Sequence, residues 1–344
     1  MPEDLATPDP AIAVDAMGGD AAPGPIVDGA VAAARHLASE LRLAGPHAVL
    51  AAELARHRDA SALRMAVVDA PEVVGMDEPP AAALRRKPGA SIRVAMAEVA
   101  AGRAAGVFSA GSTGATVMAA CTELGLLPGV DRPALAATIP TRGRPAVLLD
   151  VGANAECRPS HLVQFAVMGA VFAQTALNVA QPRVALLSIG EEASKGNELT
   201  REAHRQLRAA PVGFIGNIEA RDVYAGAADV IVCDGFTGNV ALKVSEGLVE
   251  MVETLLGAEL SATFTTRVGY LLSLRAFRRF RRRVDYTEYG GALLVGVRGV
   301  VVVGHGRSSA KAVRNAIALT ARYAREGLVD RLAAGIAGIP VTSS

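Results

Sequence analysis

Short apolar runs alternate along the chain with longer stretches that we interpret as helices. The runs are apolar at nearly every position instead of every second one, which is typical of strands covered on both faces. This alternation predicts an α/β fold in which a largely parallel sheet carries helices on both faces. The predicted strands are Ile12–Asp15, Ala48–Ala52, Met65–Asp69, Val107–Ser109, Ala146–Asp150, Val184–Ser188, Val212–Ile215, Val230–Cys233 and Val300–Val303. The predicted helices are Pro25–Leu43, Ile92–Ala101, Thr113–Glu123, His161–Asn178, Glu198–Leu207, Val240–Leu256 and Ser309–Arg325.

Many of the predicted strands end in turns that are rich in glycine and small polar residues. Six such turns follow Asp15, Ser109, Asp150, Ser188, Cys233 and Val303. Ligands of open α/β sheets bind at the carboxyl ends of the strands. The turns therefore predict one shared cleft along one edge of the sheet.

The composition indicates a soluble protein without a nucleic-acid partner. Of the 344 residues, 51% are hydrophobic, enough for a sizeable core, whereas only 4% are aromatic and none is Trp. Few aromatic rings and a net charge of +1 argue against base stacking and against a field that attracts nucleic acid. The three cysteines are far apart, which fits a reducing cytosol better than disulfides or a zinc site. Neither the first ten residues nor the apolar run at 292–304 fits a signal peptide or a membrane span.

The Gly-Ser-Thr-Gly turn at 111–114 is the best candidate for an anion site. Its backbone N–H groups and hydroxyls precede a predicted helix, where an anion would meet the helix N-terminus. An ordinary tight turn with a helix cap explains the same residues. Neither the dinucleotide-binding glycine pattern nor a P-loop occurs in a suitable place. Lys87 and Lys195 are cations that could contact a phosphate or thioester. The alternative is that both lysines lie in solvent-exposed loops.

Two further turns carry groups suited to a reacting carbonyl. The segment from Asp234 to Asn239 joins a strand to a helix, and its amide and hydroxyl groups suit an oxyanion, although helix capping also accounts for Thr237 and Asn239. His305 stands between two glycines after another strand. A lone histidine is often structural, but at this edge it is a candidate donor or acid.

Residues Tyr270–Val284 form a predicted basic amphipathic helix. Apolar side chains fall on one half of the helical circumference and most of the arginines fall on the other. Such a helix suits an acidic protein partner or an anionic membrane surface, and a solvated face over a core or dimer contact is the alternative. The candidate docking residues are Arg275, Arg278, Arg279 and Arg282.

Eight segments in order resemble the phosphate acyltransferases of the PlsX type, from about Ile12 to Ala324. They are VDAMGGDAAPGPIVDGA, LRRKPGASI, SAGSTGA, LDVGANAECRPSHLVQFAVMG, SIGEEASKGNE, FIGNIEARDVYAGAADVIVCDGFTGNVALKVSEG, DYTEYGGALLVGVRG and GHGRSSAKAVRNAI. The resemblance implies transfer of a fatty acyl group from acyl carrier protein to inorganic phosphate. The acyl phosphate would then serve a glycerol-3-phosphate acyltransferase in phospholipid synthesis. Ser112 departs from the family pattern, which has Asn at that position; the Ser hydroxyl retains a hydrogen-bond donor.

The resemblance also implies a fold similar to that of phosphotransacetylase and of the isocitrate and isopropylmalate dehydrogenases, with a protruding helical segment around 240–285. We expect a flexible leader at 1–10, one acyltransferase domain at 11–330 with two lobes around a cleft, and a tail at 331–344. A cytoplasmic homodimer with loose attachment to the inner face of the cell membrane is expected. We expect neither a cofactor nor a metal.

The expected mechanism is direct attack of phosphate on the thioester, since phosphate is already anionic and no GxSxG elbow occurs. Positioning and oxyanion stabilisation would then provide most of the rate. We expect the acyl carbonyl and transition state to contact Asn154, Asn217, Asn239 and His305. The expected substrate-binding residues are Asp15, Gly18, Gly19, Lys87, Gly111, Ser112, Thr113, Lys195, Asp234 and Thr237.

Three other functions fit parts of the sequence. A phosphotransacetylase-like enzyme would use coenzyme A thioesters. A decarboxylating dehydrogenase of the same fold would need a nucleotide loop and a cluster of metal-binding Asp residues, for which Asp15, Asp20, Asp150 and Asp234 could be mistaken. A non-catalytic scaffold would use only the arginine-rich helix to bind a carrier protein or membrane.

Overall fold

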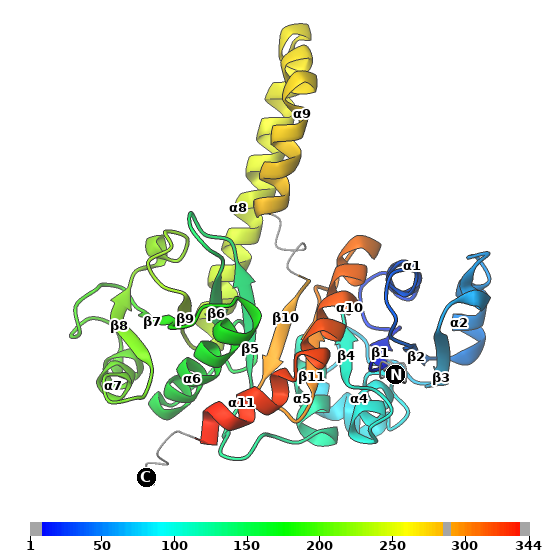
Figure 1. The fold of residues 1–344 in the computed structure, drawn as a ribbon, viewed down its shortest axis with the longest axis horizontal. Coiled ribbons are helices and arrows are strands. Elements are labelled where there is room, and N and C mark those ends of the chain that lie inside the picture. Colours follow the sequence, from blue (N-terminus) through cyan, green and yellow to red (C-terminus); the bar gives the residue numbers. More distant parts are fainter. Residues whose placement is uncertain (1–8, 285–289, 338–344) are drawn as a thin grey trace, which may run out of the picture.

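The computed structural model describes residues 9–284 and 290–337, in which eleven strands form one continuous sheet (Figure 1). The order across the sheet is β3-β2-β1-β4-β11-β10-β5-β6-β9-β7-β8. The strands are β1 Ile12–Asp15, β2 Leu41–Gly45, β3 Met65–Asp69, β4 Gly106–Ser109, β5 Ala134–Ile139, β6 Ala146–Leu149, β7 Arg183–Leu187, β8 Gly213–Ile218, β9 Val230–Val232, β10 Ala292–Val295 and β11 Val300–Val303. The predicted α/β architecture is confirmed.

Helices cover both faces of the sheet, as the continuous apolar runs predicted. One apolar core joins the sheet to α1 (Gly24–Ala34), α2 (His47–Leu54), α6 (Pro159–Ala176), α7 (Glu198–Leu207), α10 (Ala310–Arg325) and α11 (Leu328–Ala337). The core on the other face joins it to α3 (Pro80–Arg86), α4 (Ser91–Ala100), α5 (Thr113–Glu123) and the start of α8 (Gly235–Ala262). Successive strand residues point to opposite faces, so that neighbours such as Ala136 and Ala137 belong to different cores.

Strand direction reverses in the middle of the sheet, which corrects the expectation of six turns along one edge. β11 runs parallel to β4, and β4 to β1. The next three pairings, β11 with β10, β10 with β5 and β5 with β6, are all antiparallel. β6, β9, β7 and β8 then follow one another in parallel. The turns after β1, β4 and β11 therefore lie at one edge, and those after β6, β7 and β9 start from the other.

The segment around residues 35–54 differs from the prediction. The helix expected over Pro25–Leu43 ends at Ala34, and β2 follows at Leu41. The strand expected at Ala48–Ala52 is part of helix α2. A five-residue apolar run does not by itself distinguish a strand from a helix, and in this run only Leu50 is buried. Pro46 at the N-cap of α2 is compatible with a helix start.

Two strands in the centre of the sheet were not predicted. The apolar run at 292–304 contains two antiparallel strands, β10 and β11, where only the second was expected. A turn at Gly296, with φ 94°, and Gly299 separates them. Strand β5, rich in Ala, has too little contrast with its surroundings to be recognised. These two strands introduce all three antiparallel pairings.

A helical hairpin stands away from the sheet, as predicted for residues around 240–285 (Figure 1). Helix α8 starts at the sheet with two buried glycines and becomes largely exposed further along. Helix α9 (Phe264–Val284) returns along it. Large apolar side chains are exposed on both helices, including Leu255 at 59% and Leu272 at 84%.

The expected boundaries at the chain ends fall partly outside the described residues. The leader at 1–10 is described only at residues 9 and 10, and the tail only at 331–337. Residues 331–337 belong to helix α11, whose Leu332 and Ile336 are buried in the core. The division into two lobes around one cleft stays a prediction.

Candidate active site

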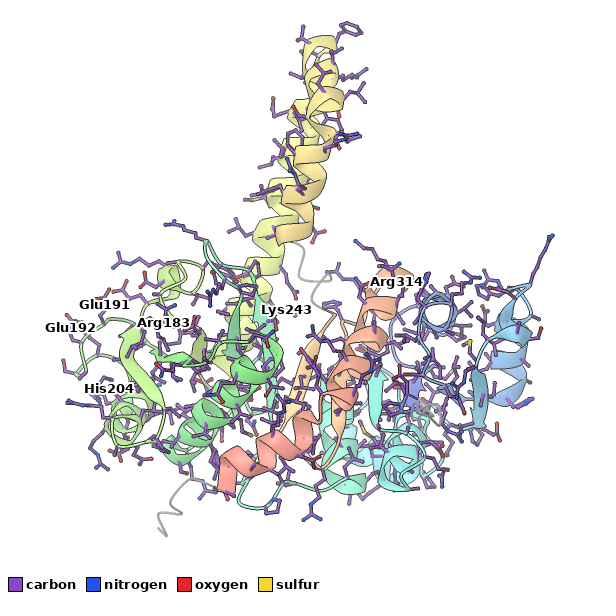
Figure 2. All side chains as sticks on the ribbon, viewed as in Figure 1. Arg183, Glu191, Glu192, His204, Lys243 and Arg314 are labelled. Atoms are coloured by element: carbon purple, nitrogen blue, oxygen red, sulfur yellow. The ribbon has the colours of Figure 1, made fainter. Side chains whose placement is uncertain are left out.

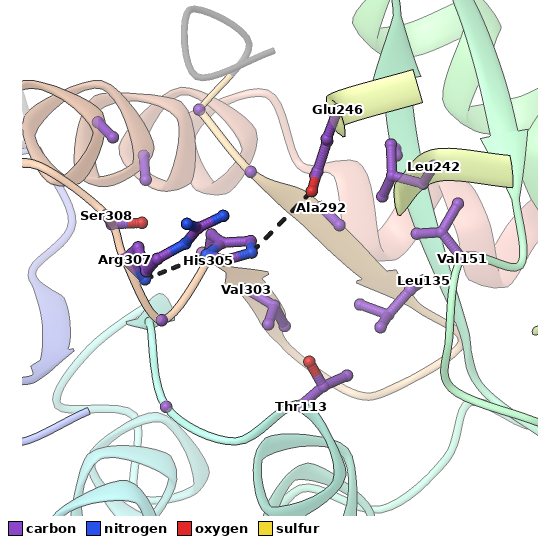
Figure 3. A pocket seen from close by; sticks show the side chains of 18 of the residues that line it. Thr113, Leu135, Val151, Leu242, Glu246, Ala292, Val303, His305, Arg307 and Ser308 are labelled. Carbon is purple, nitrogen blue, oxygen red and sulfur yellow. Dashed lines mark hydrogen bonds and ion pairs between the residues drawn. The ribbon is translucent and has the colours of Figure 1, made fainter. Parts of the chain in front are cut away.

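A cavity of about 460 Å³ lies where the turns after β1, β4 and β11 meet β5, β10 and the first turns of α8 (Figure 3). The turn after β11 contributes His305, Arg307 and Ser308. Leu135 lines it from β5, and Val151 lines it from the second position after β6. Helix α8 starts at the edge of the sheet opposite to the turns after β1, β4 and β11, and it crosses the sheet towards them. Segments from both edges therefore line the same cavity. The cavity thus has a polar side and an apolar side, which lie across from each other in Figure 3.

His305 has a defined orientation at the polar side. Its Nδ1 accepts a hydrogen bond from the backbone N–H of Arg307 at 3.1 Å. In the neutral ring the proton is therefore on Nε2, which faces Glu246 Oε2 at 4.0 Å. The pKa of His305 is lowered, first by burial and then by the positive charge of Lys243. The neutral imidazole can donate one hydrogen bond from Nε2 near neutral pH.

Two helix N-termini also meet the cavity. Helix α10 begins beside Ser309, whose Oγ accepts from the backbone N–H of Ala312 at 3.4 Å. Helix α5 begins at Thr113, and the Ser112 side chain makes no capping hydrogen bond. Unpaired N–H groups and the helix dipole favour an anion at such ends. Together with the Arg307 guanidinium, they make this the side of the cavity suited to phosphate.

A buried hydrogen-bond chain supports the turn at Gly111. The Gly111 N–H donates to Ser109 Oγ at 3.1 Å, and the Ser109 hydroxyl donates to Asp15 Oδ2 at 2.7 Å. Burial raises the pKa of Asp15. A Cβ on Gly18 would lie 2.5 Å from Asp15 Oδ2 and 2.7 Å from Gly111 N, so glycine is required for this close approach. Asp15 and Gly18 thus support the turn at Gly111 on the side away from the cavity. Gly19 packs against Gly306.

One face of α8 brings the predicted residue Asn239 to the cavity, together with three residues that the sequence analysis did not select. Asn239, Leu242, Lys243 and Glu246 all line the cavity at spacings of three and four residues. Lys243 Nζ donates to Glu246 Oε2 at 2.8 Å. The helical spacing from Asn239 was a usable signal for Lys243 and Glu246. Arg307 lay inside the Gly-His-Gly-Arg-Ser segment that was already singled out for His305.

Comparison with known proteins identifies the family. A family described as "Fatty acid synthesis protein" matches residues 11–331. A protein of Acidobacterium capsulatum named "Phosphate acyltransferase" is 50% identical over 95% of this chain and 97% of its own. One of the same name from Geobacter sp. strain M21 is 51% identical over 94% and 91%. The chain belongs to the PlsX family of phosphate acyltransferases. Its sequence-based identification as an acyltransferase enzyme is confirmed.

Solved structures with the fold of this PlsX-family chain include phosphotransacetylases. One from Streptococcus pyogenes has a TM-score of 0.62 and 18% identity, covering 92% of this chain and 94% of the other. A 4-hydroxythreonine-4-phosphate dehydrogenase from Klebsiella pneumoniae has a TM-score of 0.53 and 14% identity, covering 92% and 99%. These likenesses confirm the predicted phosphotransacetylase-like fold.

Several predicted site residues of this PlsX-family chain have their polar groups engaged elsewhere. Asn154 Nδ2 donates to Pro133 O at 2.7 Å and to Asp150 Oδ2 at 2.8 Å. Asn217 bonds His204 and the backbone of Glu192. Asp234 caps α8 by accepting from the Thr237 N–H at 2.8 Å and its hydroxyl at 2.7 Å. None of these residues lines the cavity within the described ranges, so their part in catalysis stays a prediction.

The two predicted lysines also lie outside this cavity. Lys87 Nζ donates to Val73 O at 2.7 Å and to Glu78 Oε1 at 2.5 Å. Lys195 is exposed in the loop after β7. Glu191 and Glu192 of the same loop lie well apart from Lys243 of the cavity in Figure 2. The predicted phosphate contacts that do line the cavity are Gly111 and Thr113, with Ser112 between them.

The arginine candidates lie on α9, and none of them is among the described residues that line the cavity. Arg275 and Arg279 are exposed. The side chains of Arg278 and Arg282 fall outside the described residues. In the ranges 9–284 and 290–337, no helix is long and apolar enough to cross a membrane. The same ranges contain no group of three or more His, Cys, Asp or Glu residues placed to hold a metal ion.

Proposed function

We propose that this chain transfers a fatty acyl group from acyl carrier protein to inorganic phosphate, forming an acyl phosphate. The observation that supports this best is the cavity itself. Its polar side offers Arg307, His305 and two helix N-termini to an anion, and its apolar side offers Leu135, Val151 and Leu242 to a hydrocarbon. The relatives at about 50% identity are named phosphate acyltransferases, which agrees with phosphate as the acyl acceptor in this proposal.

The proposed reaction is a direct displacement. A phosphate oxygen bonds to the thioester carbonyl carbon, and the carbonyl oxygen takes the negative charge. When the tetrahedral intermediate collapses, the carbon–sulfur bond breaks and the carrier leaves as a thiolate. A thiol with a pKa of roughly 8.5 leaves readily, so acid assistance need not be strong. His305 Nε2–H donates to the oxyanion as it forms, and Asn239 lies on the adjacent wall.

The described cysteines fit a mechanism without an acyl-enzyme intermediate. Burial raises the pKa of the Cys157 thiol to about 12, and that of Cys233 well above its usual range. Burial also raises the pKa of Cys121. The thiolate is the reactive form of cysteine, and these environments disfavour it. Phosphate therefore serves as the nucleophile in the proposal.

The cellular setting follows from the proposed reaction. An acyl phosphate is an activated acyl donor, which a glycerol-3-phosphate acyltransferase would use in phospholipid synthesis. We place the enzyme in the cytoplasm as a homodimer, in loose contact with the inner face of the cell membrane. The basic helix α9 is the proposed docking surface for the acidic carrier.

The docking proposal predicts a substrate-selective effect. Changing Arg275 and Arg279 together to Glu should raise KM for an acyl-carrier thioester about tenfold, because charge complementarity to the acidic carrier is reversed. KM for the coenzyme A thioester of the same acyl chain should change less than twofold. The matched control reverses two exposed arginines at the far end of the sheet, Arg201 in α7 and Arg208 at its C-cap. Equal effects of the two double variants would remove α9 as the docking surface.

The function itself is tested by following acyl phosphate formation from palmitoyl carrier protein and phosphate. Product should require both substrates and release one free carrier thiol per acyl phosphate. Faster turnover of palmitoyl coenzyme A than of the carrier thioester would favour the phosphotransacetylase-like alternative. Folded protein that is inactive with both thioesters would favour the non-catalytic scaffold alternative.

A further inference from the structure

We propose that Ala137 of β5 and Ala292 of β10 set the length of acyl chain that this enzyme accepts. The inference rests on the proposed function and adds the residues that select among its substrates. Both alanines line the cavity, and both belong to or pack against the same apolar core. The two alanines form the floor of the part of the cavity that extends from its polar side to beneath α8. We call this part of the cavity the hollow.

The sheet register places the two alanines next to each other. Ala292 pairs with Val303 of β11, and Leu293 pairs with Ala136 of β5. Because β5 and β10 are antiparallel, Ala137 is the residue opposite Ala292. One row across the sheet therefore reads Val303, Ala292, Ala137, Leu148, with both small side chains in its middle. The two methyl groups leave space that larger side chains would fill.

The hollow continues to an apolar end. Leu135 lies on the same face of β5 as Ala137 and about 7 Å along the strand. Val151 adjoins it, since the Val151 N–H donates to Leu135 O at 3.0 Å. Leu242 of α8 borders the hollow from above the sheet. A hydrocarbon chain that passes over the alanines thus meets apolar side chains beyond them.

Polarity and depth change together along the cavity. Leu135 is 2% exposed and Val151 is 5% exposed, although both line it. Arg307 at the opposite side is exposed, and the His305 side chain is 28% exposed. This gradient matches a thioester whose acyl tail is buried, whose carbonyl lies near His305 and whose carrier stays outside. The space over Ala137 and Ala292 lies between these two ends.

The test compares thioesters of two lengths with the same enzyme variant. Ala137→Leu should lower kcat/KM for a palmitoyl thioester by at least tenfold relative to an octanoyl thioester, because a few methylenes in an apolar pocket change binding by one to two orders of magnitude. Ala137→Val should fall between the wild type and Ala137→Leu. The shorter chain serves as the internal control, since a general loss of folded enzyme lowers both rates equally.

A second pair of variants keeps the test decisive if Ala137→Leu does not fold. Leu242→Phe adds bulk on the half-buried face of α8 that lines the hollow. Val240→Phe is the control, because it adds the same ring at a 46% exposed position outside the cavity. Only Leu242→Phe should shift the preference towards octanoyl. An unchanged chain-length preference in active Ala137 and Leu242 variants would overturn the inference. A wild-type enzyme inactive with both thioesters would instead overturn the proposed function.

Discussion

His305→Ala is expected to lower kcat by about 100-fold or more while leaving the melting temperature within a few degrees of the wild type. Removing one well-placed donor to a developing oxyanion typically costs roughly 3–4 kcal/mol of transition-state stabilisation. The structural cost is small because the ring makes one hydrogen bond, from the Arg307 N–H, and keeps 28% of its side chain exposed. Steady-state kinetics with phosphate and a palmitoyl thioester measure the effect, and thermal unfolding controls for stability.

The pH dependence provides a fingerprint that a purely structural histidine would not give. Protonation of Nδ1 would break its acceptance from the Arg307 N–H, so activity should fall as pH drops through the pKa of His305. That pKa is lowered from 6.5, so the acid limb should lie below pH 6.5. Lys243→Met removes a positive charge that lowers the pKa of His305, so the acid limb should move to higher pH. Glu246→Gln removes a negative charge that raises the pKa of His305, so the acid limb should move to lower pH. An acid limb unchanged in both variants would contradict this role for His305.

Gly238→Ala is expected to destabilise the protein by roughly 3 kcal/mol and to reduce activity as well. A Cβ at this position would overlap the carbonyl oxygen of Asp150 and lie 2.8 Å from Cys233 Sγ. The neighbouring groups are a buried backbone and a buried thiol, so α8 itself must shift, at a cost typical of overpacking. The shift would displace Asn239 and Leu242 from the cavity wall. Denaturant unfolding measures the first effect and kcat/KM the second.

Gly247→Ala is the matched control in the same helix. Nothing lies within 4 Å of a Cβ built there, so only the intrinsic preference of alanine for helix acts. The variant should be more stable by up to about 1 kcal/mol and fully active. If Gly238→Ala were as stable as Gly247→Ala, α8 would not be held against β6 by the close contact at Gly238.

The sequence predicted the parts of the fold whose signals are local. Strand β1 and helix α5 were placed at their observed bounds, because β1 is an apolar run before a glycine-rich turn and α5 directly follows such a turn. Strand β10 was missed because only a glycine turn separates it from β11 within one apolar run. The direction of pairing is set by contacts between distant segments. The antiparallel centre of the sheet therefore could not be predicted from local patterns.

The candidate site was predicted in part for the same reason. Gly111, Thr113 and His305 follow strands at one edge, and the cavity brings them together. Asn154 belongs to a motif equally rich in polar groups, yet its amide holds the backbone at Pro133. Residue type does not reveal whether a polar group is already satisfied inside the protein. Lys243 reaches the cavity only because α8 crosses from the other edge of the sheet.

The most direct test of the central claim is the KM for phosphate of Arg307→Ala. If the polar side of the cavity binds phosphate, losing this guanidinium should raise that KM about tenfold, within the range of a charged hydrogen bond. The KM for the thioester should stay within twofold, since the Arg307 N–H that orients His305 is retained. An unchanged KM for phosphate, or a rise confined to the thioester, would contradict a phosphate site between α5 and α10.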